Sequence, residues 1–183
     1  MYRTIIDKYY PQGTIGRDIF MRHSSQVAAK ALAVAHDCGL NLDPIEVETA
    51  AMLHDIGICL TNAPSIGCNG SEPYICHGIL GAQLLRQENM PEIYARVAER
   101  HTGAGLTVDD IDSQQLPLPR IDLLPETQLE RLICYADKFY SKSGDMQEKT
   151  IESVRRSMQR HGQATYERWL ALEREFGRSI TIP

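Results

Sequence analysis

The chain has little of what marks a membrane, secreted or nucleic-acid-binding protein. No stretch approaches the roughly 18 consecutive apolar residues of a membrane span. Residues 1–20 also contain no apolar core long enough for a signal peptide. Basic residues are outnumbered, with 19 Lys and Arg against 24 Asp and Glu and a formal net charge of −5. Because a general nucleic-acid binder needs a basic surface to displace counterions, this balance argues against a nucleic-acid polymer as partner.

The sequence also lacks the cysteine pattern of a disulfide framework. The cysteines number five, and no two of them form a Cys-x-x-Cys pair. We therefore expect reduced thiols in a cytoplasmic protein, with no membrane association. The apolar content of 43% and the length of 183 residues suit a soluble domain with a sizeable core.

Strand signals are scarce, whereas helical signals are many. Apolar residues recur at helical spacing over 16–38, and Gly39 is a typical helix stop. Asp43-Pro44 then marks the start of a helix that runs to about Asp55. Further helices are expected at 75–89, 91–101, 126–142, 147–160 and 163–176. The sequence predicts one all-α domain over residues 1–183, without internal repeats.

A long segment without helical pattern covers residues 109–125 and contains Pro117, Pro119 and Pro125. Long internal loops are often functional covers. We expect this loop to help close a pocket for a small molecule.

Two His-Asp dipeptides occur, and their surroundings differ. His36-Asp37 lies one turn before Gly39, where a histidine suits the helix C-terminus, so we expect it to be structural. His54-Asp55 instead ends an apolar helical run. Other predicted helices carry further histidines and an aspartate within an apolar segment, namely His23, His77, His101 and Asp137. Helical bundles build metal sites from such inward-facing side chains, because a buried carboxylate is costly unless it meets a cation. Taken singly, each residue also fits a buried histidine or a helix cap, and periodicity does not show that they converge.

The order of these residues resembles the HD superfamily of metal-dependent phosphohydrolases, in its HDIG subset. His54-Asp55-Ile56-Gly57 is the naming motif, and the resemblance covers about residues 20–142. Segments around His77, His101 and Asp137 are similar to a small, functionally unassigned group of HDIG proteins. The resemblance implies a single HD-domain helical bundle with a metal site in its core and with the helices of 147–176 at its C-terminal end.

The resemblance also implies the site and its chemistry. One metal takes His23, His54, Asp55 and Asp137, and a second takes His77 and His101, with Asp55 bridging the two. The cofactor is then a pair of divalent transition-metal ions, drawn from Fe, Mn, Zn, Co, Ni or Mg. Asp55 is a catalytic residue, and Lys138 beside Asp137 is the candidate phosphate contact. The expected enzyme is a metal-dependent phosphohydrolase that cleaves a phosphoester or phosphoanhydride of a small, nucleotide-type anionic substrate by metal-activated water.

Three further points bear on function. Some HD-fold proteins hold the same four histidines and two aspartates around two irons, so a di-iron oxygenase acting on a small molecule is the alternative. The chain lacks the Gly-Tyr-Pro motif of the superfamily's cyclic-dinucleotide phosphodiesterases. A basic tract consists of Lys142, Lys149, Arg155, Arg156 and Arg160. It could flank an anionic substrate, but we expect a solvated face.

Overall fold

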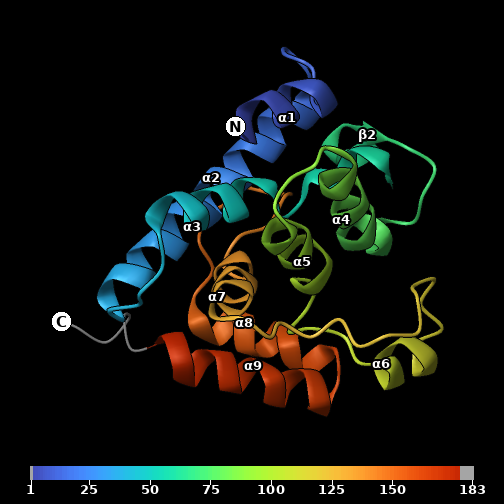
Figure 1. Ribbon diagram of the computed structural model, residues 1–183. Coiled ribbons are helices and arrows are strands. Elements are labelled where there is room, and N and C mark those ends of the chain that lie inside the picture. Colours follow the sequence, from blue (N-terminus) through green and yellow to red (C-terminus); the bar gives the residue numbers. More distant parts are fainter. Residues whose placement is uncertain (1, 178–183) are drawn as a thin grey trace.

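Helix α7 lies at the centre of a helical bundle, and the other long helices pack around it (Figure 1). The computed structural model describes residues 2–177. Its helices are α1 (Tyr2–Tyr9), α2 (Ile15–Asp37), α3 (Pro44–Leu53), α4 (His77–Gln87), α5 (Glu92–Arg100), α6 (Val108–Ser113), α7 (Gln128–Asp137), α8 (Ile151–Arg160) and α9 (Gln163–Phe176). The predicted all-α fold is confirmed. Between α3 and α4 lie short 3₁₀ turns and a minimal antiparallel pair, β1 (Asn62–Ala63) and β2 (Cys68–Asn69).

The central helix α7 is held from several sides. It contacts α2, α3, α5 and α9, and nearly all of its side chains are buried. An aromatic cluster joins it to α9, which runs along the base of the bundle in Figure 1. The ring of Tyr135 stacks on that of Trp169 at 5.3 Å, and Phe139 and Phe176 flank the pair. The last residue of α7, Asp137, is therefore fixed at the heart of the molecule.

Local capping sets the starts of the helices that carry the candidate site. The Asp43 carboxylate accepts a hydrogen bond from the Ile45 N–H at 2.9 Å, and Pro44 is the first residue of α3, as predicted. At α7, Thr127 and Glu130 form a capping box in which each side chain accepts from the other's backbone N–H. These caps set where α3 and α7 begin. His54-Asp55 follows the other end of α3, and Asp137 is the last residue of α7.

The glycine of the His-Asp-Ile-Gly segment brings two elements into backbone contact. Gly57 lies in the 3₁₀ turn η1 (Ile56–Leu60), and a Cβ added there would collide with the His77 carbonyl and the Gly81 amide of α4. Glycine therefore lets α4 approach η1 closely enough for its first residue, His77, to lie beside Asp55.

The sequence-based boundaries fail in four places. The helix expected at 147–160 begins four residues later, at Ile151. Helix α1 has no predicted counterpart, because it is short and buries few apolar side chains. Part of the segment expected to be irregular forms α6, which begins with a capping box of Thr107 and Asp110. The predicted helix 126–142 ends at Asp137, where the chain turns and leads through Gly144, which has a φ of 74°, to α8.

Two expectations about the whole chain bear on its class. Among residues 2–177, no helix is both long and apolar enough to span a membrane. Cys59, Cys68, Cys76 and Cys134 are free thiols.

Candidate metal centre

The residues expected as metal ligands come from five helices and meet in the core. His23 lies within α2, His54 and Asp55 follow α3, His77 begins α4, His101 follows α5, and Asp137 ends α7. All six side chains are buried, with no residue more than 7% exposed. The structure thus joins groups that lie up to 114 positions apart in sequence (23 to 137).

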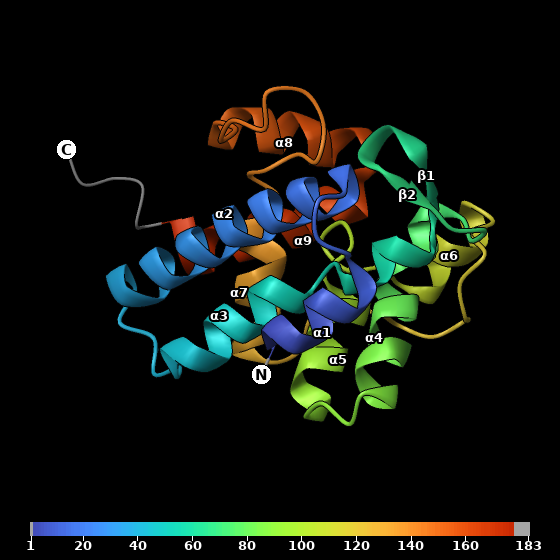
Figure 2. The ribbon, with the colours of Figure 1, turned by 90° about the horizontal axis from the view of Figure 1, so that it is seen from above.

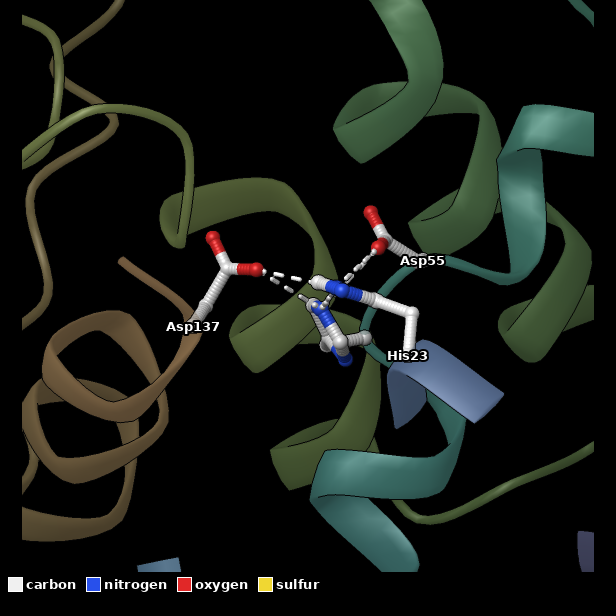
Figure 3. A group of neighbouring side chains, drawn as sticks. His23, Asp55 and Asp137 are labelled. Carbon is white, nitrogen blue, oxygen red and sulfur yellow. Dashed lines mark hydrogen bonds and ion pairs between the residues drawn. The ribbon is translucent and has the colours of Figure 1, made fainter. Parts of the chain in front are cut away.

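The first group comprises His23, His54, Asp55 and Asp137, which each offer one ligand atom within 4.8 Å of the others. The Nε2 of His23 lies 3.1 Å from Asp55 Oδ2 and 3.0 Å from Asp137 Oδ1. Figure 3 shows this imidazole lying between the two carboxylates. The Nε2 of His54 lies 3.0 Å and 3.4 Å from the same two oxygens. Two imidazole nitrogens and two carboxylate oxygens therefore surround one point, which suits a borderline transition metal.

The second group comprises Asp55, His77 and His101. It uses the other oxygen of Asp55, since Oδ1 lies 3.4 Å from His77 Nε2 and 3.3 Å from His101 Nε2. The two imidazole nitrogens are 3.1 Å apart. Asp55 therefore faces both groups, one oxygen to each, as a residue that bridges two cations must.

Hydrogen bonds orient three of the imidazoles. In each, Nδ1–H donates to the carbonyl oxygen three residues earlier at 2.6–2.7 Å, in the pairs His54–Ala51, His77–Tyr74 and His101–Ala98. Since a carbonyl can only accept, each Nδ1 carries a hydrogen, so in the neutral form of these rings the lone pair is on Nε2, which points into the site. Metal-bound histidines are usually oriented in this way. His23 differs, because its buried Nδ1 has no hydrogen-bond partner within residues 2–177.

The protonation states of the histidines differ between the two groups. Burial lowers the pKa of His77 to about 3 and shifts the pKa of His101 in the same direction. These two imidazoles are neutral at physiological pH, which is the form that binds metals. Burial also acts to lower the pKa of His54, but Asp55 and Asp137 outweigh it and raise that pKa to about 9. In the protein alone, the proton on His54 offsets part of the carboxylate charge.

Both carboxylates are ionised despite being buried. Burial acts to raise their pKa values, but nearby cations hold both well below the usual range. For Asp55 these cations are His54 and Lys142, and for Asp137 they are Lys138 and Lys142. Apart from its ion pairs, neither oxygen of Asp55 accepts a hydrogen bond from the described part of the chain. A buried, ionised carboxylate whose oxygens accept no hydrogen bond beyond these ion pairs fits a divalent cation.

The expectation that Lys142 belongs to a solvated face is wrong. Its side chain is 16% exposed, and its ammonium lies 2.6 Å from Asp55 Oδ2. On the predicted helix 126–142, Lys142 would lie about 140° around the axis from Asp137. Because α7 ends at Asp137, the chain instead turns back and returns Lys142 to the site. Two nearby serines and a glycine (141, 143 and 144) were the sequence signal for this helix end.

Two other residues complete the surroundings. The ammonium of Lys138 donates to Asp137 Oδ2 at 2.6 Å and to the His101 carbonyl at 2.9 Å, so this side chain lies beside the candidate ligands. Sequence reasoning missed Tyr74, whose ring lies 4.9 Å from that of His77. Tyr74 is 40% exposed, and the burial of the rest of its side chain acts to raise its pKa while Lys142 acts to lower it.

A cavity of about 580 Å³ opens beside the first group of ligands. Asp137 forms part of its floor, and its walls come from residues 62–66 of the β1–β2 region, from the α7–α8 connection and from α8. The β1–β2 pair and α8 lie on the same side of the molecule in Figure 2. Lysines and serines gather in this wall: Lys138, Lys142, Lys149, Ser141, Ser143 and Ser157. The loop 109–125, expected as a cover, does not line this cavity but borders a second one next to it.

His36, in the other His-Asp pair, differs from the buried candidate ligands in its exposure to solvent. Its side chain is 89% exposed and contacts Asp37, its neighbour in sequence. We expect His36→Ala to leave metal content and turnover within about twofold of wild type, because exposed substitutions away from a site have small effects. Measuring both quantities on the purified variant tests this, and loss of activity with preserved folding would contradict it.

The comparison with protein families matches residues 20–142 to the HD domain. The chain belongs to the HD-domain family. This stretch contains all six candidate ligands and ends at Lys142, so α8 and α9 lie outside the matched HD domain.

Curated relatives of this HD protein are longer than the chain itself. It is 37% identical over 124 residues to the tRNA (cytidine(56)-2′-O)-methyltransferase of Picrophilus torridus. The matched stretch covers 68% of this chain and 32% of the relative. An uncharacterized protein of Methanocaldococcus jannaschii is 36% identical over 107 residues, which is 58% of this chain and 55% of that protein. The chain therefore spans about a third to half the length of these relatives.

Solved structures share the fold. The HD domain of the L. monocytogenes phosphodiesterase PgpH has a TM-score of 0.57 and 17% identity, with 98% of this chain and 96% of that chain covered. The same domain in complex with cyclic-di-AMP has a TM-score of 0.55 and 16% identity, with 100% and 97% covered. At such identities, the likeness establishes a common fold.

Proposed function

We propose that this HD protein is a metal-dependent phosphohydrolase that cleaves a phosphoester or phosphoanhydride of a small, nucleotide-type substrate. The observation that carries the proposal is the convergence of Lys138, Lys142 and Lys149 on the cavity beside the ligand groups. These lysines stand in a chain with a net charge of −5, so their gathering at one place is not a general basic surface. Membership of the HD family supports the same chemistry.

The charge balance of the site favours an anionic substrate. In the protein alone, Lys138 and Lys142 pair with Asp137 and Asp55, each at 2.6 Å. Divalent cations bound by the same carboxylates would compete for these oxygens and leave the ammonium groups without anionic partners. A phosphate group entering the cavity would restore that balance. A neutral substrate offers no such compensation.

The proposed roles follow from position. His23, His54 and Asp137 would hold one ion, His77 and His101 would hold the other, and Asp55 would join them. Bound metals would supply Lewis acidity. They would also lower the pKa of a bound water, so that it can lose a proton and attack phosphorus near neutral pH. Lys142 and Lys138 would bind non-bridging phosphate oxygens and stabilise the charge that develops on them. The serine hydroxyls of the same wall can donate further hydrogen bonds to the phosphate.

The test is phosphate release by manganese-loaded protein under anaerobic conditions. The panel consists of nucleoside mono-, di- and triphosphates and cyclic-di-AMP, which occupies an HD domain of the same fold in PgpH. Asp55→Ala serves as the inactive control. Hydrolysis of one or more small nucleotides is expected. Oxygen consumption by the ferrous protein without phosphate release would favour the oxygenase instead, and efficient cleavage of long RNA or DNA would contradict a small substrate.

A prediction concerns the second ion. In His77→Ala and His101→Ala, we expect metal content to fall from about two ions to about one per chain. Each variant loses one of two imidazoles in the second group, while the first group keeps all four ligands. Elemental analysis of reconstituted protein measures the change. Two tightly bound ions in both variants would contradict the two-site assignment, as would a single ion in wild type.

A separate prediction concerns Lys138. Lys138→Ala should lower kcat/KM for a phosphorylated substrate by about tenfold while metal content stays unchanged. The physical reason is that its ammonium, next to Asp137, contacts the substrate rather than the metal. Steady-state kinetics and elemental analysis on the same preparation check this. Wild-type kinetics in Lys138→Ala would remove this residue from the site.

A further inference from the structure

A second cavity, of about 350 Å³, adjoins the one at the metal centre. The two cavities share Lys138 and Met158 in their walls. The second is bordered by the chain after His101, by the segment that follows α6 and by the corner between α8 and α9. Its volume falls within the range of roughly 300–1,000 Å³ typical of small-molecule pockets.

The chemistry of this second cavity differs from that of the first. Ile75, Leu106, Leu116 and Met158 give it apolar walls. Hydrogen-bonding groups come from Thr102, Gln114, Thr165 and the imidazole of His161. Among the described residues that line it, there is no carboxylate and no arginine. Lys138 contributes an ammonium, and this lysine stands on the side of the metal centre, where it bonds to Asp137. Apolar walls with a few neutral polar groups suit a flat, uncharged ring with hydrogen-bonding edges.

The walls of this cavity are tied together rather than loosely opposed. The guanidinium of Arg168, on α9, donates to the Gly105 carbonyl at 3.2 Å and to Thr165 Oγ1 at 3.2 Å. It also pairs with Asp110 of α6 at 2.6 Å. These bonds join α9 to the segment that includes α6. The cavity is therefore preformed, which lowers the entropic cost of binding a ligand there.

We propose that the second cavity binds the nucleobase of the phosphorylated substrate while its phosphate lies in the first cavity. The inference rests on the proposed phosphohydrolase function and names the part of the substrate that this HD protein recognises. Lys138 and Met158 stand where the two cavities meet, so the sugar of a nucleotide spans that junction. Met158, His161 and Thr165 lie outside the matched residues 20–142, so the α8–α9 corner supplies part of this pocket in addition to the residues of the HD domain.

The experiment compares substrates that differ in the base alone. Manganese-loaded protein is assayed with the 5′-monophosphates of adenosine, guanosine, cytidine and uridine, and with ribose 5-phosphate as the base-free analogue. Leu116→Trp fills the cavity, and Gln114→Ala removes one amide from its wall. Gln159→Ala, an exposed glutamine on α8 that lines neither cavity, is the matched control for the latter.

Wild type should prefer at least one nucleotide to ribose 5-phosphate by about tenfold or more in kcat/KM. Leu116→Trp should abolish that preference and Gln114→Ala should reduce it, with the rate on ribose 5-phosphate within about twofold of wild type in both. The retained rate also shows that each variant is folded. No preference in wild type, or an unchanged preference in both variants, would overturn the inference and leave the hydrolase standing. No phosphate release from any of the five probes also overturns the inference. No phosphate release from any nucleotide of the panel described under the proposed function contradicts that function itself.

Discussion

Replacing Asp55 with alanine is expected to lower kcat/KM by about 10⁴-fold or more. Asp55 is the one residue that belongs to both candidate ligand groups, with Oδ2 facing His23 and His54 and Oδ1 facing His77 and His101. Its loss removes an anionic ligand from each proposed ion and the connection that sets their separation. Metal content should also fall, because four of the remaining ligands are imidazoles and Asp137 is the one carboxylate left.

The measurement pairs kinetics with elemental analysis and circular dichroism. Asp55→Asn is the second variant, since it keeps the shape of the buried side chain and removes its charge. Asp109→Ala, an exposed aspartate in the first turn of α6, is the matched control and should behave as wild type. Two bound ions and turnover within tenfold of wild type in both Asp55 variants would refute the bridging role.

Replacing Lys142 with methionine is expected to lower kcat/KM by about 10²-fold without changing metal content. The ammonium of Lys142 lies at the edge of the proposed metal site, and Lys142 lines the adjoining cavity. The ammonium can therefore pair with Asp55 in the metal-free protein and with a phosphate group when substrate is bound. Methionine preserves most of the side-chain volume and removes the charge. The expected loss is therefore electrostatic and should fall on the chemical step.

The same variant should respond to metal in its stability. Without metal, Lys142→Met leaves the buried Asp55 short of a cation, so the metal-free protein should unfold at a lower temperature than wild type. With metal bound, the difference should shrink, because the ions take over that role. Thermal unfolding with and without manganese measures both effects, with Lys8→Met, on the exposed Lys8–Glu88 pair, as control. Unchanged kinetics in Lys142→Met would exclude it from the site.

Several features of the fold follow from local sequence. The Asp43-Pro44 start of α3 and the Gly39 stop of α2 depend on neighbouring residues, because caps and glycine act within one turn. The predicted span of α9 matches the structure for a similar reason. Helix ends that depend on distant partners were less predictable. Residues 138–140 have no helix-breaking side chain, yet α7 ends at Asp137. The chain then turns and brings Lys142 to the carboxylate of Asp55, which follows α3.

The sequence by itself determined the all-α class, the choice of His54-Asp55 over His36-Asp37, and the six histidine and aspartate residues that the structure brings together. These conclusions rest on periodicity, capping and motif order, which are properties of neighbouring residues or of a resemblance. Tertiary structure alone decided that one oxygen of Asp55 faces each ligand group, that Lys142 reaches Asp55, and that residues 62–66 and the α7–α8 connection, rather than the loop 109–125, border the cavity at the site. The reason is physical: side chains far apart in sequence become neighbours because α2, α3 and α5 pack on α7 and α4 packs on α5 and η1. Such packing is set by the buried surfaces of all these elements together.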